Sequence, residues 1–174
     1  MSLVTACSAP SLRDDIVRPE PSFAKPPTTE GILAEMAGDI YSSQGPEHSG
    51  FKLLDTSYDG LAWRLALIDS AVSSLDIMTY LWYPDNSGRL ILERTNKAAN
   101  RGVHVRLVVD DLLTIGLEQL IYELESRPNI EFRLFNPWED RDTLSRAGEM
   151  IAEFERLNTR MHDKLMIAER ACAY

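Results

Sequence analysis

A histidine and a lysine two positions apart, His162 and Lys164, are the residues of this sequence whose types and spacing best suit catalysis. We expect them on a β-strand, where side chains two positions apart project from one face, with Met161, Leu165 and Ile167 on the opposite, core-like face. An ammonium group stabilises negative charge on phosphoryl oxygens, and an imidazole attacks phosphorus or transfers a proton. The neighbouring positive charge favours the neutral, nucleophilic imidazole. The pair therefore suits phosphate chemistry.

A His-x-Lys pattern is short and arises often by chance, so two solvated residues on a surface strand are the alternative interpretation. Arg160 would share the face of the pair, and its guanidinium is a candidate second contact for phosphate. Asp163 would point away from both residues.

The segments that must position this pair alternate between helical and strand patterns. Apolar residues at helical spacing predict helices near 59–73, 88–100 and 117–124. Apolar and alternating runs predict strands near 75–83, 103–109 and 130–134. Gly102 follows the second helix, where a left-handed end is favoured. Strands separated by such helices predict an α/β fold with a mostly parallel sheet.

A further helical pattern lies between residues 136 and 158. Its apolar stripe includes Ile151 and Phe154, and its polar face carries Glu149, Glu153 and Glu155. We expect this helix to pack on its own domain. A lid or lipid-facing helix is the alternative, and repulsion between these glutamates and anionic headgroups counts against it.

Several other residues have types that could belong to a site. Asp110 and Asp111 end a predicted strand, where turn and cap roles are expected and a paired-carboxylate metal site is the alternative. His104 is expected on the polar face of its strand. Tyr80 and Trp82 share a strand face and are expected beneath helices, with a place at the rim of the site as the alternative.

Composition and charge limit the classes of function. The chain has 174 residues, 44% of them hydrophobic, and a net charge of −9. This fits one domain or slightly more with a real core, and it argues against a dedicated duplex-DNA binder. No apolar run approaches the roughly 18 residues of a spanning helix. Two cysteines, Cys7 and Cys172, are too few for a disulfide framework or an unaided four-ligand zinc site.

Both ends of the chain carry distinctive patterns. Val4-Thr5-Ala6-Cys7 resembles the small-residue site before a lipidated cysteine in bacterial lipoproteins, although no charged and apolar leader precedes it. A lipid on Cys7 would anchor the domain without spanning the membrane, and an accidental run of small residues is the alternative. Residues 1–50 form a proline-rich tether with a short helix over 33–41, and we place the domain at 51–174. The abrupt end at Tyr174, just after the motif, predicts an N-terminal fragment.

The stretch around the His-x-Lys pair resembles the H-x-K-x4-D signature of the phospholipase D superfamily, with His162, Lys164 and Glu169 at its three positions. From about Leu61 onward the sequence is similar to the bacterial cardiolipin synthase branch. This wider similarity covers four segments in order: 75–88, 101–111, 130–137 and 154–162. It implies a phospholipase D-like sheet flanked by helices, of which only the first half is present.

The resemblance implies a mechanism with two motif copies. One motif histidine forms a phosphohistidine with the phosphodiester, and the histidine of the second copy protonates the leaving alcohol. His162 takes one of these two roles, and Lys164 binds phosphate oxygens. No metal or cofactor is implied, because two lysines stabilise the charge. The second motif comes from a missing C-terminal half or from a homodimer partner. Glu169 replaces the aspartate of the motif, and a structural role with reduced activity is expected there.

The implied function of the full-length parent is phosphatidyl transfer between phospholipids that yields cardiolipin. Phospholipid substrates and a membrane surface are the expected partners, at the bacterial envelope and in the periplasm if Cys7 is lipidated. A phospholipid hydrolase or a nuclease is the first alternative, and the net charge of −9 disfavours nucleic acid. An inactive domain for assembly or binding is the second. The fragment alone, with half an active site, is expected to be inactive.

Overall fold

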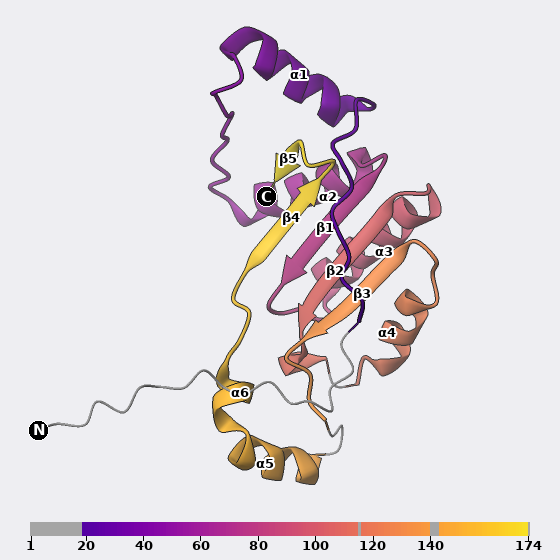
Figure 1. Ribbon diagram of the computed structural model, residues 1–174, viewed down its shortest axis with the longest axis vertical. Coiled ribbons are helices and arrows are strands. Elements are labelled where there is room, and N and C mark those ends of the chain that lie inside the picture. Colours follow the sequence, from indigo (N-terminus) through magenta and orange to yellow (C-terminus); the bar gives the residue numbers. More distant parts are fainter. Residues whose placement is uncertain (1–18, 115, 140–142, 174) are drawn as a thin grey trace, which may run out of the picture.

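A five-stranded sheet in the order β3-β2-β1-β4-β5 forms the centre of the fold (Figure 1). The computed structural model describes residues 19–114, 116–139 and 143–173. Its strands are β1 (Ser74–Thr79), β2 (His104–Asp110), β3 (Ile130–Phe135), β4 (Lys164–Ala168) and β5 (Cys172–Ala173). The first three strands are parallel to one another, whereas β4 is antiparallel to β1 and β5 to β4. The predicted α/β class with a mixed, mostly parallel sheet is confirmed.

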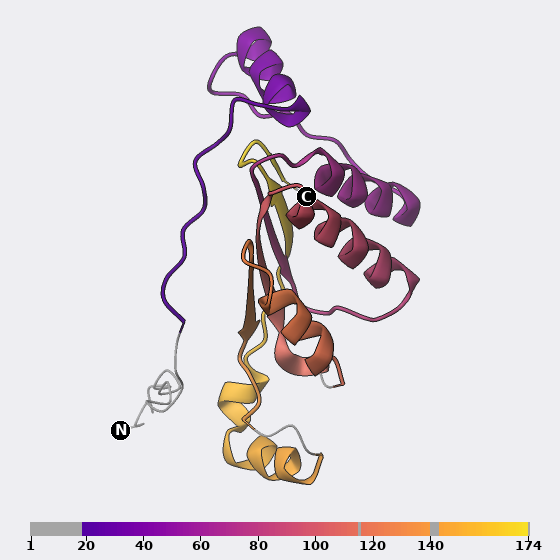
Figure 2. The same cartoon turned by 90° about the vertical axis from the view of Figure 1, so that its right-hand side faces the viewer.

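Helices cover one face of this sheet (Figure 2). Those on the covered face are α2 (Ser57–Ser70), α3 (Asn86–Asn100) and α4 (Glu118–Glu125), with a short 3₁₀ turn η1 (Asp111–Leu113) after β2. Away from this layer lie α1 (Ile32–Gln44) and the consecutive α5 (Thr143–Ala152) and α6 (Phe154–Asn158). Among the described residues, no helix has the length and apolar character needed to cross a membrane.

Local signals in the sequence define the ends of the helices. The Thr56 side chain accepts a hydrogen bond from Asp59 N and so caps α2, and Asp85 caps α3 through Gly88 N at 2.8 Å. Gly102 follows α3 with φ +97°, the left-handed conformation expected there. A Cβ at Gly88, in the first turn of α3, would lie 1.9 Å from the Tyr83 carbonyl oxygen, so only glycine fits at this position.

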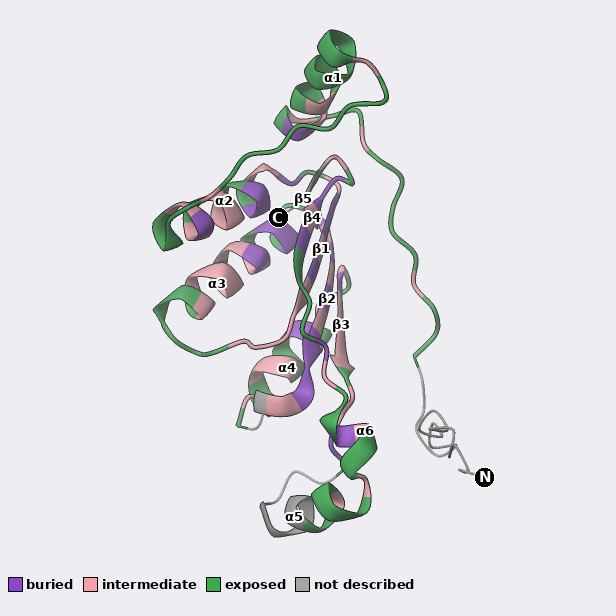
Figure 3. Ribbon diagram, turned by 90° about the vertical axis from the view of Figure 1, so that its left-hand side faces the viewer, coloured by how far each residue is buried: buried purple, intermediate pink, exposed green. Residues whose placement is uncertain are grey.

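The core lies between the sheet and its helices (Figure 3). Ile68 of α2 and Leu75 and Val105 of the sheet are fully buried there. On β4, Met166 and Ala168 face this core, whereas Leu165 is 41% exposed. The expectation that Leu165 and Ile167 would face the core is therefore wrong, because the pairing of β4 with β1 turns the even-numbered residues toward the helices.

The other face of the sheet carries an extended N-terminal segment rather than helices (Figure 2). Arg133 Nη2 donates to Glu20 O at 2.6 Å, and Arg106 Nη1 to Ser22 O at 3.4 Å. This part of the tether is extended as expected, but it contacts the sheet. The short helix expected over 33–41 is present as α1, with Leu33 buried. The domain boundary near Phe51 stays a prediction.

Candidate functional site

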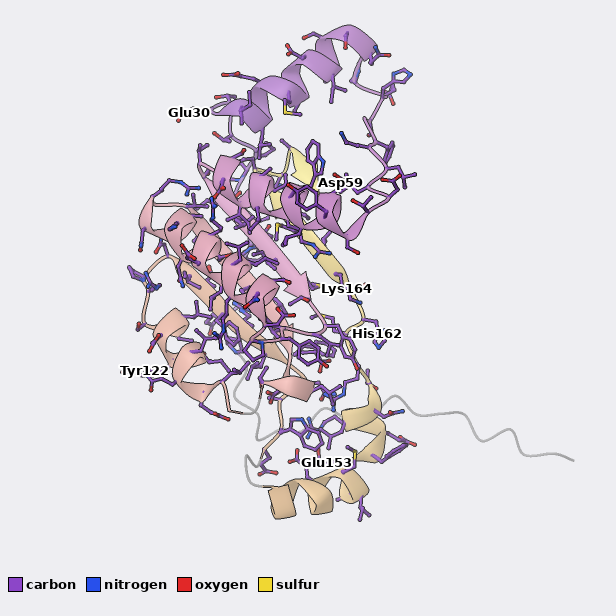
Figure 4. The ribbon with its side chains drawn as sticks, turned by 180° about the vertical axis from the view of Figure 1, so that it is seen from behind. Glu30, Asp59, Tyr122, Glu153, His162 and Lys164 are labelled. Carbon is purple, nitrogen blue, oxygen red and sulfur yellow. The ribbon has the colours of Figure 1, made fainter. Side chains whose placement is uncertain are left out.

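The motif lysine stands where the first and fourth strands meet. Lys164 opens β4 and pairs with Thr79, the last residue of β1. His162 precedes the strand, in an irregular segment after α6. The expectation that His162 and Lys164 share a strand face is therefore wrong, because β4 begins only at Lys164 and His162 lies outside the strand. Both side chains nevertheless lie at the same edge of the fold, beside the end of β1 (Figure 4).

Tyr80 links the two motif residues. Its ring stacks on the His162 ring, with centroids 4.2 Å apart and planes inclined by 28°. Lys164 Nζ lies 5.9 Å from the centroid of the same tyrosine ring. Stacking uses the face of the imidazole and leaves its two nitrogens at the edge of the ring. Tyr80 thus contacts both motif residues, which fits the alternative of a place at the rim of the site.

A groove of about 310 Å³ opens beside Lys164. Polar and apolar side chains line it together, among them Arg64, Thr79, Leu81, Trp82, Ile91 and Lys164. His162 and Lys164 are both exposed, so an anionic group in solution has direct access to them. A groove lined by a lysine together with polar and apolar side chains suits an amphiphilic phosphodiester.

Asp110 fixes the chain just before His162. Its side chain is fully buried and accepts hydrogen bonds from Leu112 N at 2.9 Å, Met161 N at 3.1 Å and Arg160 Nη1 at 3.1 Å. The first of these bonds caps η1, as the expected turn role requires. The other two attach the segment before His162 to the carboxyl end of β2. Asp110 therefore positions the histidine.

Arg160 is held within the fold by this carboxylate. Its side chain is 9% exposed, and its guanidinium carbon lies 5.5 Å from the centroid of the Trp138 ring. Arg160 also precedes β4, so it does not share a strand face with Lys164 as expected. A contact between Arg160 and phosphate stays a prediction.

Asp111 makes a second connection at this edge of the sheet. The residue is fully buried, and its Oδ2 accepts a hydrogen bond from Trp138 N at 2.8 Å. Its Oδ1 accepts a bond from the Thr114 hydroxyl. Asp111 thereby joins the turn after β2 to the connection after β3, a structural role of the kind expected from the sequence.

Glu169, at the third motif position, lies at the far end of β4. Its carboxylate is 1% exposed, and Oε1 accepts hydrogen bonds from Val72 N at 2.6 Å, Ser73 N at 2.8 Å and Ser74 N at 3.3 Å. It thus holds the turn between α2 and β1. Five steps along the chain separate it from Lys164, about 17 Å at the 3.3 Å rise per residue of a strand. This geometry agrees with the expected structural role and keeps the carboxylate away from the reacting groups.

The remaining candidates lie elsewhere or outside the described residues. His104 Nε2 lies 2.8 Å from Glu131 Oε1 on the face of the sheet that has no helices, a polar-face position as expected. Hydrogen bonding from Ser22, together with His104 and Arg133, lowers the pKa of Glu131 below its ordinary value. Cys7 falls outside the described residues, and the side chain of Cys172 is likewise not described.

The contacts of two residues with the motif segment were not predicted from the sequence. A place at the rim was only the alternative for Tyr80, and Asp110 was expected in a turn or cap role with no link to His162. Their relation to the motif depends on the placement of β4 beside β1 and of α6 beside the end of β2. No local pattern encodes either placement, because both join segments about 50 residues or more apart.

The sequence is similar to a known family and to known bacterial proteins. The profile of the family described as "Cardiolipin synthase, PLD-like domain" matches residues 65–174. Cardiolipin synthase C of Escherichia coli is 45% identical over 122 residues, which are 70% of this chain and 25% of that protein. An uncharacterised Helicobacter pylori protein is 35% identical over 150 residues, 84% of this chain and 30% of the relative. The chain thus spans between a quarter and a third of the length of these relatives.

Solved structures of the superfamily are more distant. NucT from Helicobacter pylori is 20% identical with a TM-score of 0.44, covering 64% of this chain and 60% of that one. Nuc from Salmonella typhimurium, a phospholipase D family member, is 23% identical with a TM-score of 0.38, covering 62% and 55%.

Proposed function

This chain belongs to the phospholipase D-like family of cardiolipin synthases, and from that membership we propose that it supplies one catalytic half of a phosphatidyltransferase that forms cardiolipin. The observation that carries the proposal is the cluster of His162, Tyr80 and Lys164 at an exposed edge of the sheet. The imidazole of His162 stacks on the ring of Tyr80, and the Lys164 ammonium lies beside a groove lined largely by apolar side chains. This combination suits a lipid phosphodiester.

The proposed reaction has two steps. The imidazole of one motif histidine attacks phosphorus of the phosphatidyl donor, so that a P–N bond forms while the P–O bond to the headgroup alcohol breaks. The other motif histidine donates the proton that the leaving oxygen needs. It then takes a proton from the acceptor alcohol, whose oxygen bonds to phosphorus as the P–N bond breaks. His162 fills one of these two roles.

Lys164 and Tyr80 support the chemistry of His162 without exchanging protons in this scheme. The Lys164 ammonium stabilises the charge that builds on the two non-bridging oxygens in each transition state. Tyr80 fixes the plane of the imidazole, so that a ring nitrogen is presented toward the phosphate rather than sampling many directions. Asp110 fixes the backbone that carries the ring.

The second histidine must come from outside the residues of this motif. The chain contains three histidines, and only His162 is followed two positions later by lysine. We propose that a further segment of a longer protein, or a second copy of the chain, supplies the other motif. The single half is accordingly expected to be inactive alone.

The substrate is proposed to be phospholipid at the bacterial envelope, with lipidation of Cys7 as the proposed anchor. The net charge of −9 counts against nucleic acid, because a nucleic-acid groove gains its affinity from basic groups. Hydrolysis by the same site is the competing activity, since water in place of an acceptor alcohol completes the second step.

The test is an assay of the full gene product with phosphatidylglycerol vesicles and chromatographic separation of the lipids. Cardiolipin as the main product supports the proposal. Phosphatidic acid alone would instead identify a hydrolase. Cleavage of single-stranded or plasmid DNA with no lipid turnover would identify a nuclease, and no turnover of either substrate would indicate a binding or assembly domain.

A further inference from the structure

The α5–α6 junction lies below the sheet (Figure 1), and three of its apolar residues are exposed. Ile151 is 83% exposed, Phe154 58% and Met150 38%, and the three positions fall within five consecutive residues. We call these three residues the apolar tip. Exposed apolar residues scattered singly need no explanation, but three so close in sequence, in the segment that leads to His162, suggest an interaction surface.

Two of the three glutamates near the tip, Glu149 and Glu153, are paired with Arg156. Glu149 Oε1 accepts a hydrogen bond from Arg156 Nη2 at 2.7 Å, and its side chain is 7% exposed. Glu153 pairs with Arg156 Nε, and its side chain is 25% exposed. Pairing with one guanidinium reduces the charge of these two carboxylates from −2 to −1, and Glu155 stays exposed, so the expected repulsion from anionic headgroups is weakened rather than removed.

Hydrogen bonds fix the tip rigidly relative to His162. Asn136 Nδ2 donates to Arg156 O at 2.6 Å and to Thr159 O at 2.8 Å, which ties α6 to the end of β3. Leu157 and Met161 are buried, at 1% and 7% exposure. The chain between Phe154 and His162 is thus anchored at both ends, and any surface that receives the tip also sets the distance of the imidazole from it.

We propose that the apolar tip inserts into the outer acyl region of a phospholipid bilayer and so holds His162 and Lys164 at the level of the headgroup phosphates. This inference rests on the proposed function, because it takes phospholipid as the substrate. Helices that lie at a membrane surface bury aromatic and aliphatic side chains at the boundary between headgroups and acyl chains. The tip is short, so it contributes orientation and a modest affinity rather than permanent attachment.

The experiment measures sedimentation of the full chain with vesicles of phosphatidylglycerol and phosphatidylcholine in equal parts. The double variant Ile151→Ser/Phe154→Ser should bind about tenfold or more weakly, from the loss of two buried apolar side chains. Tyr122→Ser is the matched control, since Tyr122 is an exposed aromatic (68%) on α4, away from the tip (Figure 4). It should bind as the wild type does. Met150→Trp should strengthen binding, which keeps the test informative if the double variant folds poorly.

Equal vesicle binding by the wild type and the double variant would overturn the proposal, as would no vesicle binding by the wild type. Loss of self-association in the double variant, measured by sedimentation velocity without lipid, would instead assign the tip to contact with a second copy and would also overturn it. Failure here is separate from failure of the proposed function. Binding needs no turnover, and hydrolysis or transfer of a short-chain monomeric phosphatidylglycerol needs no bilayer.

Discussion

The ring of Tyr80, one residue beyond the end of β1, stacks on the imidazole of His162 at 4.2 Å between centroids. The contact joins two residues 82 positions apart in the chain and defines the plane of the proposed catalytic ring. Since the Lys164 ammonium approaches the same tyrosine, one side chain organises both motif residues.

Tyr80→Leu should lower kcat about tenfold in the full gene product, because an aromatic pair contributes about 1 kcal/mol beyond its buried area and the imidazole would lose its fixed orientation. Tyr80→Phe keeps the ring and should retain nearly the wild-type kcat. Lipid turnover by both variants checks this. A Phe variant as slow as the Leu variant would show that the hydroxyl, and not stacking, is what matters.

Lys164→Met should reduce kcat by about a hundredfold, the usual loss when one charge-stabilising donor is removed from a transition state. Lys97→Met is the control, because Lys97 is an exposed lysine on α3 that pairs with Glu93. That variant should turn over lipid at the wild-type rate. Similar losses in both variants would point to a general effect of positive charge on lipid binding.

Asp110→Asn should destabilise the fold by about 3 kcal/mol, because it leaves the Arg160 guanidinium in a buried site without its charged partner. Urea denaturation measures the free energy of unfolding. The matched control is Asp69→Asn, which breaks the more exposed pair with Arg94 and should cost less than about 1 kcal/mol. If the two variants lose equal stability, the hydrogen bonds of Asp110 to Arg160 and Met161 do not stabilise the fold more than a surface ion pair does.

Glu169→Ala should cost about 2 kcal/mol of stability, since the backbone N–H groups of Val72 and Ser73 lose their acceptor. It should leave kcat per folded molecule unchanged, because the carboxylate is far from Lys164. Glu169→Gln retains an oxygen at the same reach and should be the milder change. A large fall in kcat at unchanged stability would contradict the structural role of this motif position.

The order of helices and strands was predictable because each element carries its own period of apolar residues. The faces of β4 were not, since Leu165, Met166, Ile167 and Ala168 are all apolar and alternation cannot choose between the two sides. The motif residues were recognisable from their types and spacing. The contacts of Tyr80 and Asp110 with the motif segment depend on pairing between distant strands and loops, which a single sequence does not reveal.

The inward orientation of Glu149 and Glu153 was unpredictable for a similar reason. A helical repeat indicates which residues share a face, but the pattern breaks between α5 and α6, where Glu153 stands. The break lets Arg156 reach both carboxylates. Counting charges along an ideal helix therefore missed the pairing of these two carboxylates with Arg156.

The most direct test of the central claim compares His162→Ala with His104→Ala in the full gene product, using phosphatidylglycerol vesicles and cardiolipin as the product. His104 is the matched control, because it pairs with Glu131 on the face of the sheet that carries the N-terminal segment, outside the His162–Tyr80 stack. We predict that His162→Ala loses about a thousandfold in kcat, while His104→Ala keeps the wild-type rate. Cardiolipin formation by His162→Ala at the wild-type rate would contradict the account.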